Sequence, residues 1–313
     1  MGRYAFVGRR VLQMIPVLIG ITIITFFLLR LIPGDPALAI LGDRYTPERG
    51  AELRQSLGLQ KPVWDQYVLF MQHLFHGNLG ESISFREPAR TVIADRLPAT
   101  LFLVAYAAVL AAVLSIPAGV VSALRRGRAV DQTVRVTSLV GFAMPPFWLG
   151  IMFILVFAVK VPVFPVNGYG NGFVDHLYYL FLPALTIAVA FSTILIRTLR
   201  ASTLSALNSE YVDTARIKGI SRFSVLRRHV FRNAVVSIVV VYGINLAFLI
   251  SGTVIVEEVF AVPGLGRLLI DSVDTRDYPV VQGVTLVFAF LIVFVNLLTD
   301  VVHAALDPRV TVE

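Results

Sequence analysis

Long apolar runs alternate with short polar links along most of this chain. Six runs reach the length of about 20 residues that a helix needs to cross a bilayer core. They lie near 11–31, 99–124, 135–161, 177–198, 234–256 and 279–302, and their middles contain no Asp or Glu. Because a membrane span must satisfy its own backbone polar groups, the pattern predicts an all-α polytopic membrane protein with six transmembrane helices.

The links between the runs differ greatly in length and divide the chain into three parts. Residues 1–31 form the N-terminus and first transmembrane helix, and 32–98 form a long first extracytoplasmic segment. Residues 99–313 form a core with five further transmembrane helices, interrupted by the polar link 199–233 and by a second outer segment over 257–279. We find no internal repeat and no low-complexity tract.

The long first link has a pattern of its own. Thr46-Pro47-Glu48 predicts a helix N-terminus, and Gly58 predicts the end of that helix. Apolar residues then recur at helical spacing from Trp64 to Phe75, which predicts an amphipathic helix lying on the bilayer or on a neighbour. This segment is either a lid over the bundle or a part that contacts the substrate.

The second outer segment is rich in turn signals. Pro263-Gly264-Leu265-Gly266 predicts a turn, and Arg267 to Val273 predicts a short helix. Gly264-x-Gly266 is also a fragment of a dinucleotide-binding pattern, but no soluble strand precedes it, so we interpret it as a turn.

Composition and charge agree with a membrane protein. The chain is 57% hydrophobic and 15% charged, whereas a soluble domain carries about 25% charged residues. Lys and Arg cluster in the links 125–134 and 199–233 and are absent from 162–176. The net charge of +7 is therefore a topology signal that places both termini in the cytoplasm, with no indication of nucleic-acid binding. The first run is longer than a secretory signal core, which favours an uncleaved anchor.

Several kinds of chemistry lack their sequence signals. No phosphate-binding loop occurs, and the spans offer no mid-membrane acid or histidine of the kind that ion-coupled carriers use. The chain has no cysteine and no His-Glu-x-x-His motif. His73 and His76 lie three residues apart, but two ligands without acidic or Cys partners favour a surface position, so we expect no metal site and no cofactor bound by this chain.

The basic link before the fifth run predicts two short helices. Glu210 and Asp213 fall in the first turn of one helix and Arg216 and Lys218 in its last turn, as the helix dipole favours. Gly219 then suits the C′ position that ends the helix. Such a segment is either a docking element for a soluble partner or an interfacial helix whose arginines bind anionic lipid.

Proline and aromatic residues interrupt the third run. A break at membrane depth is tolerated where it lines a cavity or packs within protein. The segment therefore either borders a translocation pathway or makes ordinary helix packing; its residues are Phe142, Met144, Pro145, Phe147 and Trp148.

Asp213-x-Ala215 with Gly219 resembles the EAA loop of bacterial ABC importer permeases. The fuller pattern is similar to the dipeptide/oligopeptide/nickel permease family, first (B-type) subunit. The residues that carry this resemblance in the loop are Tyr211, Val212, Asp213, Thr214, Ala215, Arg216, Lys218, Gly219, His229, Arg232, Asn233 and Ala234. Further family-like strings include 30–36, 57–59, 77–80, 98–100, 145–148, 259–266, 276–279 and 307–309.

The chain departs from the family pattern at three positions. Asp213 stands where the loop usually begins with Glu, and Thr214 stands at the usual second Ala. Ser237 stands where the family often has Pro, which leaves open any kink at the start of the fifth span.

The resemblance implies an ABC type I importer permease-like fold in the bacterial cytoplasmic (inner) membrane. It implies that the loop from Tyr211 to Gly219, with His229, Arg232 and Asn233, couples the bundle to ATPases. The implied partners are a homologous C-type permease subunit, two ABC ATPase subunits that hold ATP and Mg, and an extracytoplasmic substrate-binding protein. The expected function is peptide import, without catalysis by this chain itself.

The resemblance leaves the substrate and the outer contacts open. Dipeptides, oligopeptides, nickel chelates, glutathione and other small solutes all belong to similar systems. Arg276, Asp277, Glu257 and Glu258 are candidates for an outer gate or a binding-protein contact, and the two glutamates form either a contact with an amine or a solvated boundary. An ion-coupled secondary carrier and a membrane-bound enzyme remain the rival classes.

Overall fold

The computed structural model describes residues 3–31, 45–56, 60–225 and 232–306. Within these ranges the chain is helical, without a β-strand, apart from a single bridge between Glu81 and Pro88. The contacts divide it into two compact units. Unit 1 comprises 1–11, 101–262 and 291–313, and unit 2 comprises 12–100 and 263–290.

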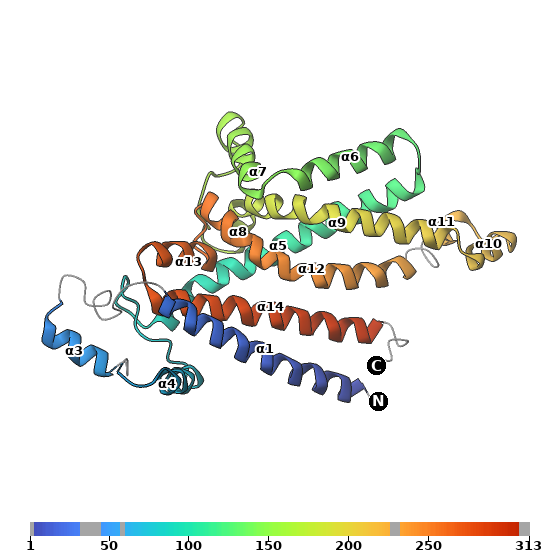
Figure 1. Cartoon of the computed structure of the whole chain (residues 1–313). Coiled ribbons are helices and arrows are strands. Elements are labelled where there is room, and N and C mark those ends of the chain that lie inside the picture. Colours follow the sequence, from blue (N-terminus) through green and yellow to red (C-terminus); the bar gives the residue numbers. More distant parts are fainter. Residues whose placement is uncertain (1–2, 32–44, 57–59, 226–231, 307–313) are drawn as a thin grey trace. The chain divides into compact units, whose positions relative to one another are not determined.

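Within the described ranges, five helices are long and apolar enough to cross a membrane. They are α1 (Arg3–Leu31), α5 (Ala89–Leu124), α9 (Phe181–Leu207), α12 (Arg232–Val259) and α14 (Tyr278–Leu306), labelled in Figure 1. The predicted third span is instead a bent pair, in which α6 (Ala129–Ala143) meets the segment Pro146–Lys160 at 105°. The described residues thus offer five candidate spans by length and composition, or six if the bent pair is one span.

The bend follows from two consecutive prolines. A residue before proline is pushed out of the helical region, and Met144 and Pro145 are both extended, with ψ of 129° and 136°. Pro146 then begins α7 (Pro146–Phe153), where its missing N–H costs no helical hydrogen bond. A π-helix over Ile154–Lys160 continues α7. The predicted interruption of this run is confirmed.

Unit 2 contains most of the predicted outer segment. The predicted first helix is α3 (Pro47–Ser56), and the backbone N–H of Arg49 donates to the Thr46 hydroxyl at 3.3 Å, as expected of an N-cap. Gly58, the predicted end of this helix, lies outside the described residues. The predicted amphipathic helix is α4 (Val63–Phe75), and the short helix expected after the turn is α13 (Leu265–Asp274).

Helix α4 crosses the end of α1 through an aromatic cluster (Figure 1). The ring centroids of Phe26 and Tyr67 lie 5.2 Å apart, and the Tyr67 hydroxyl is 2.8 Å from that of Thr22. Trp64 and Phe75 remain exposed on α4. Helix α4 thus rests on the first span, and its exposed apolar side chains are left uncovered by the described residues.

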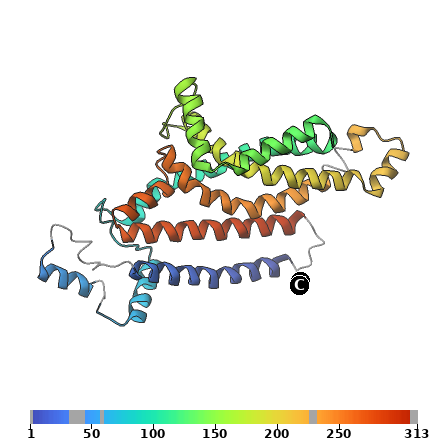
Figure 2. The same ribbon diagram turned by 45° about the horizontal axis from the view of Figure 1, so that its top comes forward.

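Unit 1 is built around α9. In both views α6 and α9 run side by side, and α12 lies against α9 (Figure 1 and Figure 2). A small residue also lets α5 approach α9 closely: a β-carbon at Gly119 of α5 would lie 2.6 Å from the Leu199 side chain. The Tyr242 hydroxyl of α12 donates to the carbonyl of Ala108 in α5. Helix α8 (Phe173–Tyr179) precedes α9, and α10 (Glu210–Ile217) and α11 (Arg222–Val225) follow it.

Candidate functional site

Helix α10 ends where its sequence predicts. Gly219 has a φ of +73°, the left-handed conformation expected at C′, and the N–H of Ile220 donates to the Ala215 carbonyl at 3.1 Å. The N–H of Lys218 also closes the last turn on the Thr214 carbonyl at 3.1 Å. The prediction for Gly219 as the helix stop is confirmed.

One face of α10 is buried within the chain. Val212 is 0% exposed and Ala215 is 5% exposed, and both pack in an apolar cluster with Ala206 of α9 and Val225 of α11. This cluster, which we call the α10 anchor, fixes α10 to the end of α9. Val212 and Ala215 therefore hold the helix in place and do not present their side chains to a partner.

The opposite face of α10 is exposed. Successive residues turn by about 100°, so Ile217 lies about half a turn away from the Val212–Ala215 face. The Ile217 side chain is 86% exposed, and Thr214, Lys218 and Gly219 are also exposed. Tyr211 is partly exposed beside them. Ile217 was not among the predicted site residues; its position off the buried stripe is the signal that identifies it.

Several predicted loop residues cannot be assigned to either face. The side chains of Asp213, Arg216, Arg232 and Asn233 lie outside the described part of the structure, although Arg232 and Asn233 begin α12. His229 lies outside the described residues altogether. Their coupling roles stay predictions.

A buried polar cluster joins α6 and α9 near the predicted cytoplasmic end of both helices. Asp131, in the first turn of α6, is 2% exposed. The Arg200 guanidinium of α9 donates from Nε and Nη2 to its two carboxylate oxygens, each at 2.8 Å. Ser122 Oγ and the backbone N–H of Gly127 complete the set at 2.6 and 2.9 Å. Sequence analysis missed this pair because 69 residues separate its members.

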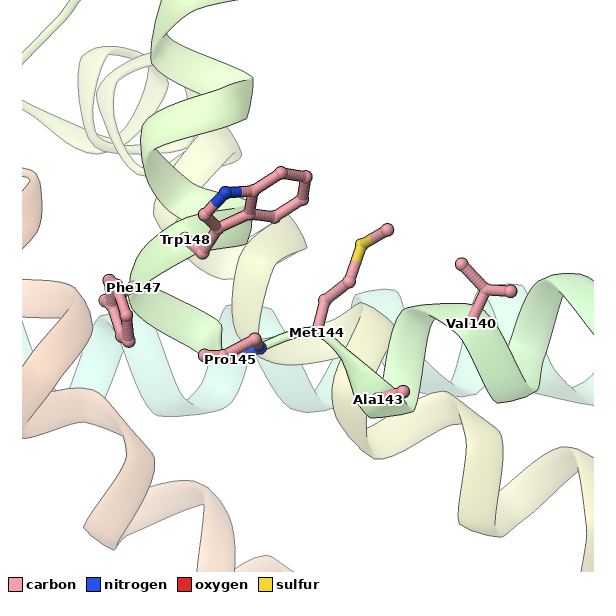
Figure 3. Close-up of a pocket in the computed structure, with 6 residues that line it drawn as sticks. All are labelled: Val140, Ala143, Met144, Pro145, Phe147 and Trp148. Carbon is pink, nitrogen blue, oxygen red and sulfur yellow. The ribbon is translucent and has the colours of Figure 1, made fainter.

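The elbow between α6 and α7 holds an apolar pocket of about 380 Å³. It is lined by Val140, Ala143, Met144, Pro145, Phe147 and Trp148. Figure 3 shows the side chains of Val140, Met144 and Trp148 rising into the angle between the two helices. The structure thus brings together four of the five predicted pathway residues; Phe142 is exposed on α6 but does not line the pocket.

The four predicted outer residues lie in different environments. In unit 1, Glu257 is buried near the end of α12 whereas Glu258 is exposed. In unit 2, Asp277 is buried and accepts hydrogen bonds from the Ser82 hydroxyl and, at 3.1 Å, from the Ser84 backbone N–H. Arg276 is exposed in a left-handed conformation with φ of +58°. Asp277 and Glu257 are thus internal residues, and Arg276 and Glu258 are surface residues.

The chain matches a known protein family over most of its length. Residues 115–312 match the family described as binding-protein-dependent transport system inner membrane component, and residues 3–104 match the N-terminal part of such membrane components. The chain belongs to this family. Its members are permease components of transport systems, so the predicted family and the multi-pass membrane location are confirmed.

Full-length relatives of this permease are named as peptide transporters. The dipeptide transport system permease protein DppB of Escherichia coli K12 is 37% identical, covering 97% of this chain and 98% of its own. The di/tripeptide transport system permease protein DppB of Pseudomonas aeruginosa is 36% identical, with 98% of both chains covered. A Brucella suis relative is 41% identical over 98% of both chains.

Solved structures share the fold of this permease. Two inward-facing structures of the MetNI methionine ABC transporter cover 69% of this chain and 96% of theirs. Their sequence identity is 16% and their TM-scores are 0.55 and 0.59. An amino acid ABC transporter crystallised with histidines gives a TM-score of 0.52. The predicted ABC importer permease fold is confirmed.

Proposed function

We propose that this chain is one of two homologous permease subunits of an ATP-driven importer that takes up peptides. The observation that carries the proposal is similarity along the full chain to permeases named for dipeptides and for di- and tripeptides, at 36–37% identity. Substrate would arrive on an extracytoplasmic binding protein, and two ATPase subunits holding ATP and Mg would bind the opposite side. This chain would itself catalyse no reaction.

The exposed face of α10 supports the ATPase partnership. Ile217 is 86% exposed and Tyr211 is 41% exposed, so this face presents two large side chains that an ATPase surface would cover. The α10 anchor supports a mechanical role, because movement of α10 is passed to α9 through packed apolar side chains. Ile217, Thr214 and Lys218 would make the contact, and Val212 and Ala215 would transmit it.

The orientation of the chain is part of the proposal. Short loops rich in Lys and Arg stay in the cytoplasm, which gives cytoplasmic N- and C-termini and puts α10 on the side of the ATPases. The alternative interpretation is an interfacial helix on anionic lipid, for which an exposed face with Ile217 and Lys218 would also be suitable. Binding of purified ATPase subunits to the permease distinguishes the two interpretations.

The elbow pocket is our candidate for the translocation pathway. Its apolar lining suits peptide side chains of mixed size, and Met144 supplies an adaptable surface of the kind that promiscuous sites use. We favour peptides over nickel chelates as the substrate class because full-length relatives are named for dipeptides and for di- and tripeptides.

The test is reconstitution. The permease is co-expressed with its partner permease and ATPases, placed in proteoliposomes, and supplied with the binding protein and a labelled dipeptide. We expect uptake that requires ATP and the binding protein. Uptake driven by an ion gradient without ATPases would support a secondary carrier instead. ATP-dependent uptake of glutathione or a nickel chelate, with no uptake of any peptide, would refute the peptide assignment alone.

A further inference from the structure

The Asp131 carboxylate is satisfied by four donors, two on each oxygen. Oδ1 accepts from Arg200 Nε and Ser122 Oγ, and Oδ2 accepts from Arg200 Nη2 and the N–H of Gly127. A bidentate guanidinium–carboxylate pair fixes the mutual orientation of its two side chains as well as their distance. Because Asp131 is 2% exposed, loss of Arg200 would leave a buried carboxylate without its counter-charge, which is strongly unfavourable. We call the Asp131–Arg200 pair the clamp.

The clamp is the first of three contacts that keep α6 and α9 in one antiparallel register. Seven residues further along α6 and seven residues back along α9, the Thr193 hydroxyl donates to the Ser138 carbonyl at 2.6 Å. Beyond that, a β-carbon at Gly141 would lie 2.8 Å from Val189 Cγ1, so the two backbones approach closely there. The three contacts occupy one continuous seam between the helices.

The seam connects α10, where the proposed function places the ATPase contact, with the elbow pocket, where it places the translocation pathway. At one end, α9 leads into the α10 anchor through Ala206. At the other, α6 stops at Met144 and Pro145, where the elbow pocket opens. The stretch of α9 from Val189 to Ala206 is about 26 Å long at 1.5 Å per residue. A continuous series of packed side chains therefore links the exposed face of α10 to the elbow pocket.

We propose that α6 and α9 move as one rigid lever in the transport cycle and that the Asp131–Arg200 clamp holds the lever together. Displacement of α10 would swing α9, and α6 would follow only because it is clamped to α9. The extended Met144–Pro145 segment is the hinge. The movement of α6 ends there and changes the angle between α6 and α7. Asp131 and Arg200 are thus positioning residues for transport. This inference rests on the proposed function, since it needs an ATPase at α10.

The first experiment breaks the clamp while keeping its shape. In the reconstituted complex, Asp131→Asn removes the charge and turns one acceptor into a donor that faces Arg200 or Gly127. We expect ATP hydrolysis per assembled complex to persist and peptide uptake per ATP hydrolysed to fall at least tenfold. Asp175→Asn is the matched control, because Asp175 is exposed and caps a loop through Asn171 at 3.2 Å. This control should keep the wild-type value of peptide uptake per ATP hydrolysed.

The amount of peptide taken up per ATP hydrolysed distinguishes a loss of coupling from a loss of stability. A merely structural role for Asp131 would reduce the number of assembled complexes and leave uptake per ATP unchanged in those that remain. If Asp131→Asn fails to assemble, Arg200→Lys replaces it, because Lys keeps the charge but loses the two-pronged geometry. A wild-type ratio in an assembled clamp variant would overturn the proposal.

The second experiment tests rigidity directly. The chain has no cysteine, so the pair Gly141→Cys and Val189→Cys can form only one intramolecular disulfide. If α6 and α9 move as one body, oxidation leaves uptake unchanged, as it does in either single-Cys variant. Loss of uptake on oxidation of the pair alone, restored by a reductant, would mean that the helices slide past each other and would overturn the lever.

Failure of the lever and failure of the proposed function give different results. If the wild-type complex shows no ATP-dependent uptake, the proposed function fails before any variant is compared. If wild type transports and the clamp variant or the disulfide gives the contrary result, only the lever fails.

Discussion

Ile217 offers the sharpest test of the proposal that the exposed face of α10 contacts the ATPases. Its side chain is 86% exposed on the free permease, on the side of α10 that points away from the α10 anchor. Replacing it by Ala removes three carbon atoms and no polar group. The substitution favours the helix slightly, since Ala is the better helix former. Any loss of function must therefore arise from a partner that covers this position.

The size of the effect follows from the exposed fraction. Each buried methylene contributes about 0.8 kcal/mol, so three carbons contribute about 2.4 kcal/mol when fully covered. Scaled by the 86% exposure in the free chain, docking should weaken by about 2 kcal/mol, or about 30-fold in Kd. The free energy of unfolding of the permease itself should change by less than about 0.5 kcal/mol, as at other exposed positions.

The assay is a titration of immobilised permease pairs, in nanodiscs, with the purified ATPase subunits. Ile255→Ala is the matched control, because Ile255 is also exposed, at 47%. It lies near the end of α12 that the proposed orientation places outside the cell membrane, away from the ATPases. It should leave Kd unchanged. An Ile217→Ala variant that binds the ATPases with wild-type affinity would refute the assignment of this face, whatever its effect on uptake.

Three further outcomes follow from the structure. A β-carbon at Gly219 would meet none of the described residues, so Gly219→Asn, which tolerates the left-handed conformation, should keep coupling. Gly219→Leu should hydrolyse ATP without uptake, and normal uptake by assembled Gly219→Leu would contradict this. Asp277→Ala leaves the buried Ser82 hydroxyl and the partly buried Ser84 N–H without their acceptor, and it should lower stability by about 2 kcal/mol, measured as a lower unfolding midpoint. Exposed Asp274→Ala should change the midpoint little, and equal midpoints for the two variants would contradict the buried role of Asp277. Met144→Cys, in a chain without native cysteine, should react with an aqueous thiol reagent in one transport state, and lack of reaction in every state would oppose a pathway at the elbow.

Local chemistry made part of the candidate site predictable. Charges at the two ends of α10 agree with the helix dipole, and Gly219 was the residue best able to adopt a left-handed backbone. The break before α7 followed from Pro145 and Pro146, because proline restricts the residue that precedes it. These features depend on neighbours within a few residues, so the linear pattern contains what is needed to find them.

The faces of the helices were less predictable. Val212 and Ala215 belong to the motif that carries the family resemblance, yet their side chains are internal, and the exposed Ile217 stood outside the predicted set. A short helix of eight residues has too few positions to show which of its two apolar sides is covered. That choice depends on Ala206 and Val225, which the fold brings to α10 from other helices.

The sequence alone determined that this is a helical membrane permease, because span length, charge distribution and motif order are properties of the linear chain. Only the tertiary structure decided that Asp131 and Arg200 meet, that the third run is bent by 105°, and that α6 and α9 share one register. Such pairings depend on which helices pack together across tens of residues. No local pattern encodes that packing, and it follows from the shapes of whole helices burying one another.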